Sequence, residues 1–162
     1  QFKLEFFEFV PYLQEAIFSG GESFLSRTYI DIWREIIAKN PNCRISVNTN
    51  GSVLTDEIKD LFEAGNFHVN LSIDSVNKTT YEQIRKGASF EKVMAHLDYF
   101  LDYAKRNTEV ISMPVCPLTL NAKEFPDIVR FCNQRGMRVD FQHVFNAYDV
   151  ALQYASKSVL EE

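Results

Sequence analysis

Short strand-like segments alternate with amphipathic helical segments along the whole chain. The pattern predicts strands at residues 14–19, 44–50, 67–74, 108–115 and 137–144. It predicts helices at residues 2–13, 24–40, 56–64, 79–86, 90–104, 122–132 and 149–160. A helix between two strands returns the chain to the same end of a sheet, so this order predicts an α/β fold of parallel βαβ units with right-handed crossovers.

Residues that cap free backbone N–H groups mark the starts of several predicted helices. Thr55 and Ser89 each stand directly before a predicted helix, as N-caps do. Two further starts carry the spacing of a capping box, Thr79 with Glu82 and Asn121 with Glu124. These four caps set the expected first turns of the helices.

The middle strands carry a polar row opposite an apolar row. The polar row consists of Ser46, Asn48 and Asn50, then Asn70, Ser72 and Asp74, and in the last strand Asp140 and Gln142. Successive strand residues face opposite sides, so helices must cover the apolar rows and the polar rows must line the concave face of a barrel-like sheet. These side chains could form a structural hydrogen-bond network or line a lumen that holds a polar ligand.

Composition excludes several classes of protein. The 162 residues are 46% hydrophobic and 24% charged, which is typical of a globular chain, and we treat residues 1–162 as a single domain. No apolar run approaches the roughly 18 residues that a membrane span needs. With a net charge of −5 and scattered basic residues, the chain has no electrostatic footprint for nucleic acid. Neither a membrane nor a nucleic acid is expected as a partner.

The cysteines indicate a reducing compartment. Cys43, Cys116 and Cys132 are far apart and lack the spacing of a metal site, so we assign no metal ligand. Unpaired thiols without a secretory signal predict a cytoplasmic protein. No residue is assigned as a catalytic acid, base or nucleophile, and His143 is read as a core or rim histidine. The chain starts without Met, from which we expect that an upstream segment is missing.

The carboxyl ends of the predicted strands carry the candidate binding residues, because ligands of parallel α/β folds gather there. Gly20 and Gly21 let a ligand approach the backbone, and with Glu22 they suit an ammonium group. Ser72 ends a later strand, and Arg85 follows it closely enough to take a carboxylate. Taken alone, each of these segments is also an ordinary turn or helix end.

Together these segments resemble the radical S-adenosylmethionine (radical SAM) enzymes from about residue 14 to residue 145. The resemblance rests on four segments in order, Phe18-Ser19-Gly20-Gly21-Glu22, Thr49-Asn50-Gly51, Leu71-Ser72-Ile73-Asp74-Ser75 and Ile84-Arg85-Lys86-Gly87. It implies a partial (β/α)6 TIM-like barrel. It also implies roles in binding S-adenosylmethionine: Gly20, Gly21 and Glu22 on the ammonium, Ser72 and Arg85 on the carboxylate, and Asn50 and Asp74 near the ribose or the substrate. Asn121, Gln142 and His143 are weaker candidates.

The chain departs from the family in its cysteines. The family binds a [4Fe-4S] cluster through a Cys-x3-Cys-x2-Cys loop after its first barrel strand, and this chain has no such loop. We therefore expect the five strands to be the second to the sixth of the barrel, with the first strand and the cluster loop upstream of Gln1. No cluster is expected in this chain. A smaller departure is Ser23, where many relatives have Pro.

The resemblance implies that the intact parent enzyme cleaves S-adenosylmethionine reductively at its cluster and makes a 5′-deoxyadenosyl radical that abstracts hydrogen. Its substrate would be a peptide or a small molecule, in peptide maturation or cofactor biosynthesis. The chain alone is expected to be inactive, to bind S-adenosylmethionine weakly, and to self-associate through an open strand edge. One alternative is a non-catalytic α/β barrel module that has lost the cluster. Another is an ordinary TIM-barrel aldolase or isomerase, but the chain has no strand-end lysine or late phosphate loop.

Overall fold

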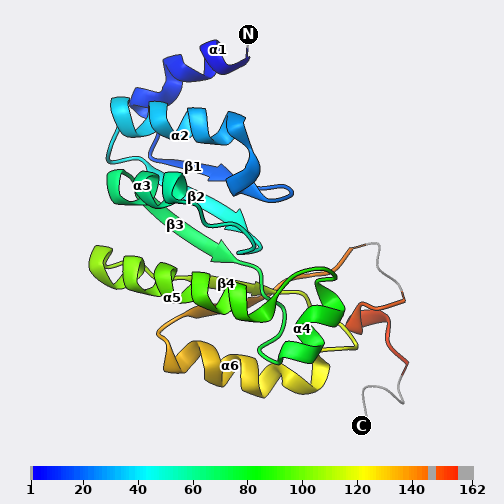
Figure 1. Ribbon diagram of the computed structural model, residues 1–162. Coiled ribbons are helices and arrows are strands. Elements are labelled where there is room, and N and C mark those ends of the chain that lie inside the picture. The colour runs from blue at the N-terminus through cyan, green and yellow to red at the C-terminus, as the bar shows by residue number, and fades with distance from the viewer. Residues whose placement is uncertain (1, 146–148, 157–162) are drawn as a thin grey trace.

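The computed structural model describes residues 2–145 and 149–156. Its centre is a parallel sheet of five strands in the order β1-β2-β3-β4-β5. The strands are β1 (Glu15–Phe18), β2 (Arg44–Thr49), β3 (Asn66–Leu71), β4 (Ser112–Val115) and β5 (Arg138–Phe141). Strands follow one another across the sheet in chain order, which confirms the predicted α/β fold with parallel βαβ units (Figure 1).

Helices connect successive strands and lie along the sheet (Figure 1). The connecting helices are α2 (Arg27–Lys39), α3 (Asp56–Ala64), α4 (Lys78–Ile84), α5 (Phe90–Asn107) and α6 (Phe125–Gln134), and α1 (Phe2–Phe9) precedes β1. Short 3-10 helices occur at Val10–Tyr12, Ser23–Leu25, Ala122–Glu124 and Leu152–Tyr154. No helix in residues 2–145 or 149–156 is long and apolar enough to cross a membrane.

The core lies between the apolar rows of the strands and the inner faces of the helices. Trp33 of α2 is fully buried and meets Phe67 of β3 edge to face, at 5.6 Å between ring centroids. Phe62 of α3 stacks on Phe67, with ring centroids 4.4 Å apart. Because the helices cover the apolar rows in this way, the opposite, polar rows are left on the other face of the sheet, as predicted.

Two of the four predicted caps are confirmed. The Thr55 side chain accepts a hydrogen bond from the Ile58 N–H at the start of α3, and Ser89 accepts one from the Lys92 N–H at the start of α5. Both are local arrangements, in which the cap and the N–H that donates to it lie three residues apart.

The two predicted capping boxes are wrong. Helix α4 is capped by Asn77, whose Oδ1 accepts from the N–H groups of Thr79 and Thr80. Glu82 instead accepts from the Phe90 N–H. The Asn121 side chain makes no capping bond either, because it bonds to Asp74, Cys116 and Leu118 as described below, and a 3-10 turn precedes α6.

Several predicted boundaries also differ. Strand β4 begins at Ser112 instead of residue 108, because Thr108 takes a left-handed conformation (φ 57°) that ends α5. The predicted helix 24–40 is a 3-10 turn followed by α2, which Ser26 caps. The predicted helix at 149–160 is wrong over its described part, where Ala151 bridges Leu118 and only a 3-10 turn follows. The rest of that segment lies outside the described residues.

Candidate functional site at the carboxyl ends of the strands

The loop that follows β1 has an open backbone. Gly20 and Gly21 have φ values of 101° and 58°, which L side chains rarely adopt, and a Cβ atom on either would meet nothing within 4 Å. Both glycines are exposed. A ligand therefore has room to approach the backbone of Gly20 and Gly21, whereas the Ser19 carbonyl of the same loop accepts a hydrogen bond from the Tyr29 hydroxyl at 2.9 Å.

Glu22 joins the loop after β1 to the end of β2. Its Oε1 accepts hydrogen bonds from Thr49 Oγ1 at 2.7 Å and from the Phe24 N–H at 3.1 Å, and its Oε2 accepts one from the Asn50 N–H at 2.9 Å. A carboxylate offers about four acceptor positions, so these three bonds leave one on Oε2. Glu22 thus shapes the loop and keeps limited capacity for a further donor such as an ammonium.

Hydrogen bonds also link the ends of β2 and β3 to each other and to the segment after the Gly20–Gly21 loop. The Ser72 N–H donates to the carbonyl of Thr49 at 2.9 Å, and the buried hydroxyl of Ser23 donates to the carbonyl of Asn48 at 2.7 Å. The Asn50 side chain is turned along its own loop, where its Oδ1 accepts from the Ser52 N–H at 2.8 Å. One end of the sheet therefore brings together the Gly20–Gly21 loop, Glu22, Asn50 and Ser72, as predicted.

Asp74 points into the protein instead of toward solvent. Its side chain is 3% exposed, and its Oδ2 forms an ion pair with Arg85 Nη2 at 2.5 Å. Its Oδ1 accepts from the Cys116 N–H at 2.8 Å. The Arg85 side chain is 32% exposed, and its buried Nε has no partner among the described residues. This Nε is closed to a ligand, but the partly exposed remainder of the side chain suits a ligand carboxylate.

Of the weaker candidates, Asn121 is fully buried and its amide groups are used within the protein. His143 is exposed, and its ring packs against Phe145. Gln142 and His143 both line a cavity beside Pro117 and Phe141. Of the three, Gln142 alone also lines a further cavity at the strand ends.

That cavity has a volume of about 360 Å³ and follows the predicted polar rows. It is lined by Asn48, Asn70, Ser72, Pro114, Cys116, Asp140 and Gln142. Across it, Asn70 Nδ2 donates to Asn48 Oδ1 at 2.9 Å. Cys116 is a lining residue that the sequence did not predict, although its place directly after β4 is a signal for one. Burial, reinforced by the charge of Asp74, raises the pKa of the Cys116 thiol.

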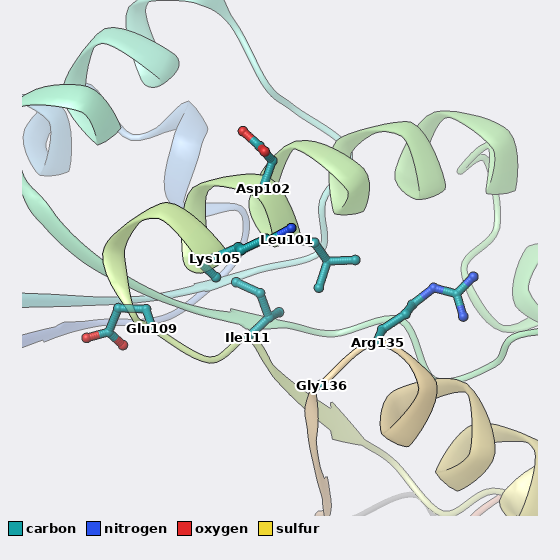
Figure 2. Close-up of a pocket in the computed structure, with 8 residues that line it drawn as sticks. Leu101, Asp102, Lys105, Glu109, Ile111, Arg135 and Gly136 are labelled. Atoms are coloured by element: carbon teal, nitrogen blue, oxygen red, sulfur yellow. The ribbon is translucent and has the colours of Figure 1, made fainter.

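A second cavity, of about 370 Å³, lies between the last turns of α5 and α6 (Figure 2). Asp102 and Lys105 come from α5, and Arg135 and Gly136 follow α6. In βαβ units the helices end near the amino ends of the next strands, so this cavity lies at the other end of the sheet. No predicted binding residue lines it.

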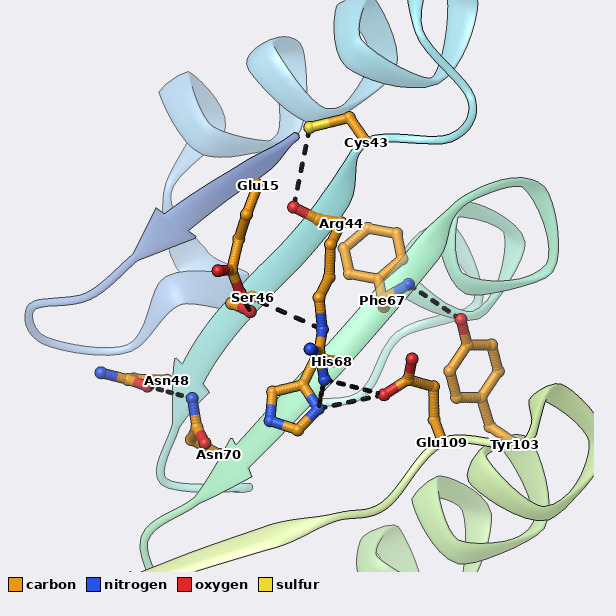
Figure 3. A network of polar contacts seen from close by, with 10 residues as sticks. All are labelled: Glu15, Cys43, Arg44, Ser46, Asn48, Phe67, His68, Asn70, Tyr103 and Glu109. Atoms are coloured by element: carbon orange, nitrogen blue, oxygen red, sulfur yellow. Dashed lines mark hydrogen bonds and ion pairs between the residues drawn. The ribbon is translucent and has the colours of Figure 1, made fainter. Parts of the chain in front are cut away.

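A polar network fills the concave face toward the amino ends of the strands (Figure 3). Arg44 Nη2 lies 2.8 Å from His68 Nδ1 and 3.0 Å from Glu109 Oε2, and Ser46 Oγ donates to Glu15 Oε1 at 2.5 Å. These residues line a cavity of about 610 Å³. Arg44, His68 and Glu109 lie in three separate segments of the chain, and the sequence did not predict that they meet.

The cysteines do not fit a [4Fe-4S] cluster. Cys43 precedes β2 at the amino ends of the strands, whereas Cys116 follows β4 at the carboxyl ends. Cys132 is buried on the inner face of α6, with its sulfur 3.6 Å from Met113 Sδ, and burial raises the pKa of its thiol to about 11. Cluster ligands must be closely placed thiolates, so these three cannot share a cluster. No group of cysteine, histidine and carboxylate side chains suited to a metal ion occurs within the described residues.

Known proteins match this chain in sequence and in structure. A sequence model of the Radical SAM superfamily matches residues 3–132. A GTP 3′,8-cyclase of Synechococcus elongatus is 30% identical over 154 residues, 93% of this chain and 46% of the relative. A probable GTP 3′,8-cyclase of Methanocaldococcus jannaschii is 31% identical over 119 residues, 73% of this chain and 38% of the relative. The chain thus spans less than half the length of these curated relatives.

Solved structures share the fold at low sequence identity. Streptococcus suis SuiB bound to precursor peptide SuiA has a TM-score of 0.65 at 11% identity, over 80% of this chain and 28% of that one. The structure of anSMEcpe with bound AdoMet has a TM-score of 0.60 at 16% identity, over 80% of this chain and 35% of that one. These likenesses confirm the predicted TIM-like architecture, and the match over residues 3–132 shows that the chain belongs to the radical SAM superfamily.

Proposed function

We propose that this chain is the S-adenosylmethionine-binding core of a radical SAM enzyme. The observation that carries the proposal is the meeting of the glycine loop after β1, the Thr49–Asn50 turn and Ser72 at one end of the sheet, with Arg85 joined to that end through Asp74. Ligands of parallel α/β folds bind at this end. Membership of the superfamily and the bound AdoMet of a structural neighbour support the same cofactor.

Two groups of residues would hold the methionyl part of the cofactor. The open carbonyls of Gly20 and Gly21, with the remaining acceptor position of Glu22, suit its ammonium group. The Ser72 hydroxyl and the partly exposed Arg85 guanidinium suit its carboxylate. Asn50 lies beside Glu22 and would approach the ribose or the substrate. The polar cavity of about 360 Å³ would receive the substrate, a peptide or a small molecule.

The residues present suit the organic cofactor but not the cluster. We propose that the ligands of the [4Fe-4S] cluster lie outside residues 1–162, and that the isolated chain makes no 5′-deoxyadenosyl radical. Affinity for S-adenosylmethionine should then be weak, since contacts to an iron are lost while ammonium and carboxylate contacts remain. A Kd of about 1 mM, equal to about 4 kcal/mol, is the expected order.

An NMR titration of the 15N-labelled chain with S-adenosylmethionine tests the proposal. The largest amide shifts are expected at Gly20, Gly21 and Ser72. Arg85→Ala should weaken binding about tenfold, because a hydrogen bond to a charged group contributes about 1.5–3 kcal/mol. Lys86→Ala, at the exposed neighbouring position, is the control and should leave the affinity unchanged. Shifts confined to the amino ends of the strands, or an affinity that Arg85→Ala does not alter, would contradict it.

A second candidate function is a non-catalytic binding module, which the absence of suitably placed cysteines in this chain favours. Translating the natural gene on the 5′ side of the codon for Gln1 separates the two. A Cys-x3-Cys-x2-Cys within about one βα unit supports the enzyme, and anaerobic reconstitution of the longer protein should then yield 5′-deoxyadenosine. A reading frame without those cysteines supports the module.

A further inference from the structure

We propose that Asp74 is a positioning residue, which holds the Arg85 guanidinium in place for the ligand carboxylate and does not touch the ligand itself. The inference rests on the proposed binding of S-adenosylmethionine at this end of the sheet. It reassigns Asp74, which the sequence placed near the ribose or the substrate.

The protein itself occupies both carboxylate oxygens of Asp74. One accepts from the Cys116 N–H at 2.8 Å, and the other pairs with Arg85 Nη2 at 2.5 Å. With 3% of the side chain exposed, a ligand has little access to either oxygen. A buried carboxylate needs such partners, because an unpaired charge in the interior is costly.

The backbone at Asp74 is built to turn this side chain inward. Its φ of 66° lies in the left-handed region, where residues other than glycine are uncommon. Such a conformation costs on the order of 1–2 kcal/mol and persists only where the surroundings impose it. Here the strained turn directs the carboxylate under the end of β4, toward Cys116 and Arg85.

Asn121 supplies the surroundings that impose the turn. Its Nδ2 donates to the carbonyl of Asp74 at 2.7 Å and to the carbonyl of Cys116 at 2.9 Å, while its Oδ1 accepts from the Leu118 N–H at 2.9 Å. Asn121 is fully buried. Its amide therefore fixes the end of β3 against the segment after β4, and the position of Asp74 with it.

The long side chain of Arg85 is held in place by the rigidly fixed carboxylate of Asp74. Arg85 follows the last turn of α4, where its N–H donates to the carbonyl of Tyr81 at 2.8 Å. An arginine side chain loses about 2 kcal/mol of conformational entropy when a ligand alone must fix it. The ion pair with Asp74 fixes the side chain beforehand and leaves 32% of it exposed, which lowers the cost of binding a ligand there.

Asp74→Asn tests the inference with little disturbance of the fold. Asparagine tolerates the left-handed conformation and keeps an oxygen for the Cys116 N–H, but it loses the charge that holds Arg85. The probes are S-adenosylmethionine and its decarboxylated form, which lacks only the carboxylate. Asp127→Asn, an exposed carboxylate of α6 paired with Arg130, is the matched control.

Asp74→Asn should weaken binding of S-adenosylmethionine about tenfold and change that of the decarboxylated form less than twofold. Arg85→Gln should do the same, and the double variant should lose no more than either single one, because the two residues act as a unit. Equal loss for both probes, or no loss for either, would overturn the inference alone. If the unaltered chain bound neither probe, the proposed function would fail as well.

The unaltered chain provides a measurement that does not depend on the variant folding. The 15N NMR signals of the Arg85 guanidinium should show slower rotation about its Cζ–N bonds than those of Arg135, which is exposed and stacks on the Phe131 ring. Free rotation at Arg85 would overturn the inference whatever the binding data.

Discussion

The hydroxyl of Thr49 donates a hydrogen bond of 2.7 Å to the carboxylate of Glu22, and this bond joins the carboxyl ends of β1 and β2. The same hydroxyl accepts a hydrogen bond from the Gly51 N–H at 3.0 Å. Thr49 therefore fixes the loop after β1 through Glu22 and the loop after β2 through Gly51. Residues proposed to bind the ammonium and the ribose thus depend on one buried threonine.

Thr49→Val should destabilise the chain by about 2–3 kcal/mol. Valine has the same shape but leaves the Gly51 N–H and one lone pair of Glu22 without a partner, and buried polar groups without partners cost about 1–3 kcal/mol each. Urea unfolding measures the change. Thr79→Val, at an exposed position of α4, is the control and should change stability by less than about 0.5 kcal/mol. If Thr49→Val lowered the free energy of unfolding no more than Thr79→Val does, the two hydrogen bonds of Thr49 would not stabilise the chain.

Local signals predicted the fold well. Strand alternation gave β2 and β3, and Thr55 and Ser89 cap their helices through bonds to residues three positions on. Such features depend on neighbours in sequence, and a single sequence displays them directly. The Gly20–Gly21–Glu22 segment was likewise recognisable because its residues are contiguous.

Features that depend on partners distant in the chain could not be predicted. Asn121 has the spacing of a capping box, yet it binds the carbonyl of Asp74, 47 residues away. The left-handed turn that brings Asp74 to Arg85 has no glycine to signal it. Arg44 and Glu109 meet across 65 residues only because parallel strands place them at one end of the sheet.

Gly51→Ala should destabilise the chain by about 3 kcal/mol. Its φ is 72°, and a Cβ there would lie 2.6 Å from Val93 Cγ2 and 2.7 Å from Leu71 Cδ1. Left-handed strain contributes about 1–2 kcal/mol and overpacking about 1–3 kcal/mol. Gly87→Ala separates the two effects, since its φ is 83° but a Cβ would meet nothing within 4 Å, and it should cost only about 1 kcal/mol. If Gly51→Ala and Gly87→Ala lowered the free energy of unfolding equally in thermal or urea unfolding, crowding at Gly51 would be unimportant.

Tyr99→Phe should stabilise the chain by about 1 kcal/mol at neutral pH, because the Tyr99 hydroxyl is buried without a partner among the described residues. Tyr103→Phe, on the same helix, should destabilise it, since that hydroxyl accepts from the Phe67 N–H and donates to the carbonyl of Gly65. Urea unfolding of both variants gives the comparison. Destabilisation by Tyr99→Phe would mean that its hydroxyl has a partner in solution.

Because of Tyr99, we expect the chain to lose stability in alkaline solution. Burial raises the pKa of Tyr99 to about 12, above the value of about 10 in an unfolded chain. Between these values the unfolded state releases the proton first and so binds fewer protons than the native state, which makes the free energy of unfolding fall as pH rises. Below pH 10 the contribution of Tyr99 to the free energy of unfolding no longer changes with pH. Unfolding measured from pH 9 to pH 12 should show a shallower fall for Tyr99→Phe, and identical profiles would rule Tyr99 out as a source.

The open edge of β1 predicts self-association of the chain. β1 pairs with β2 on one side, and no strand of the described residues pairs with its other side. Ile17 of this strand is 69% exposed. Exposed edge strands template pairing with a second copy, and a lysine on the edge opposes it. Sedimentation should therefore show a concentration-dependent dimer that Ile17→Lys abolishes. Leu120→Lys, at an exposed apolar residue after β4, should leave the dimer intact, and a chain that stays monomeric at every concentration would refute edge pairing.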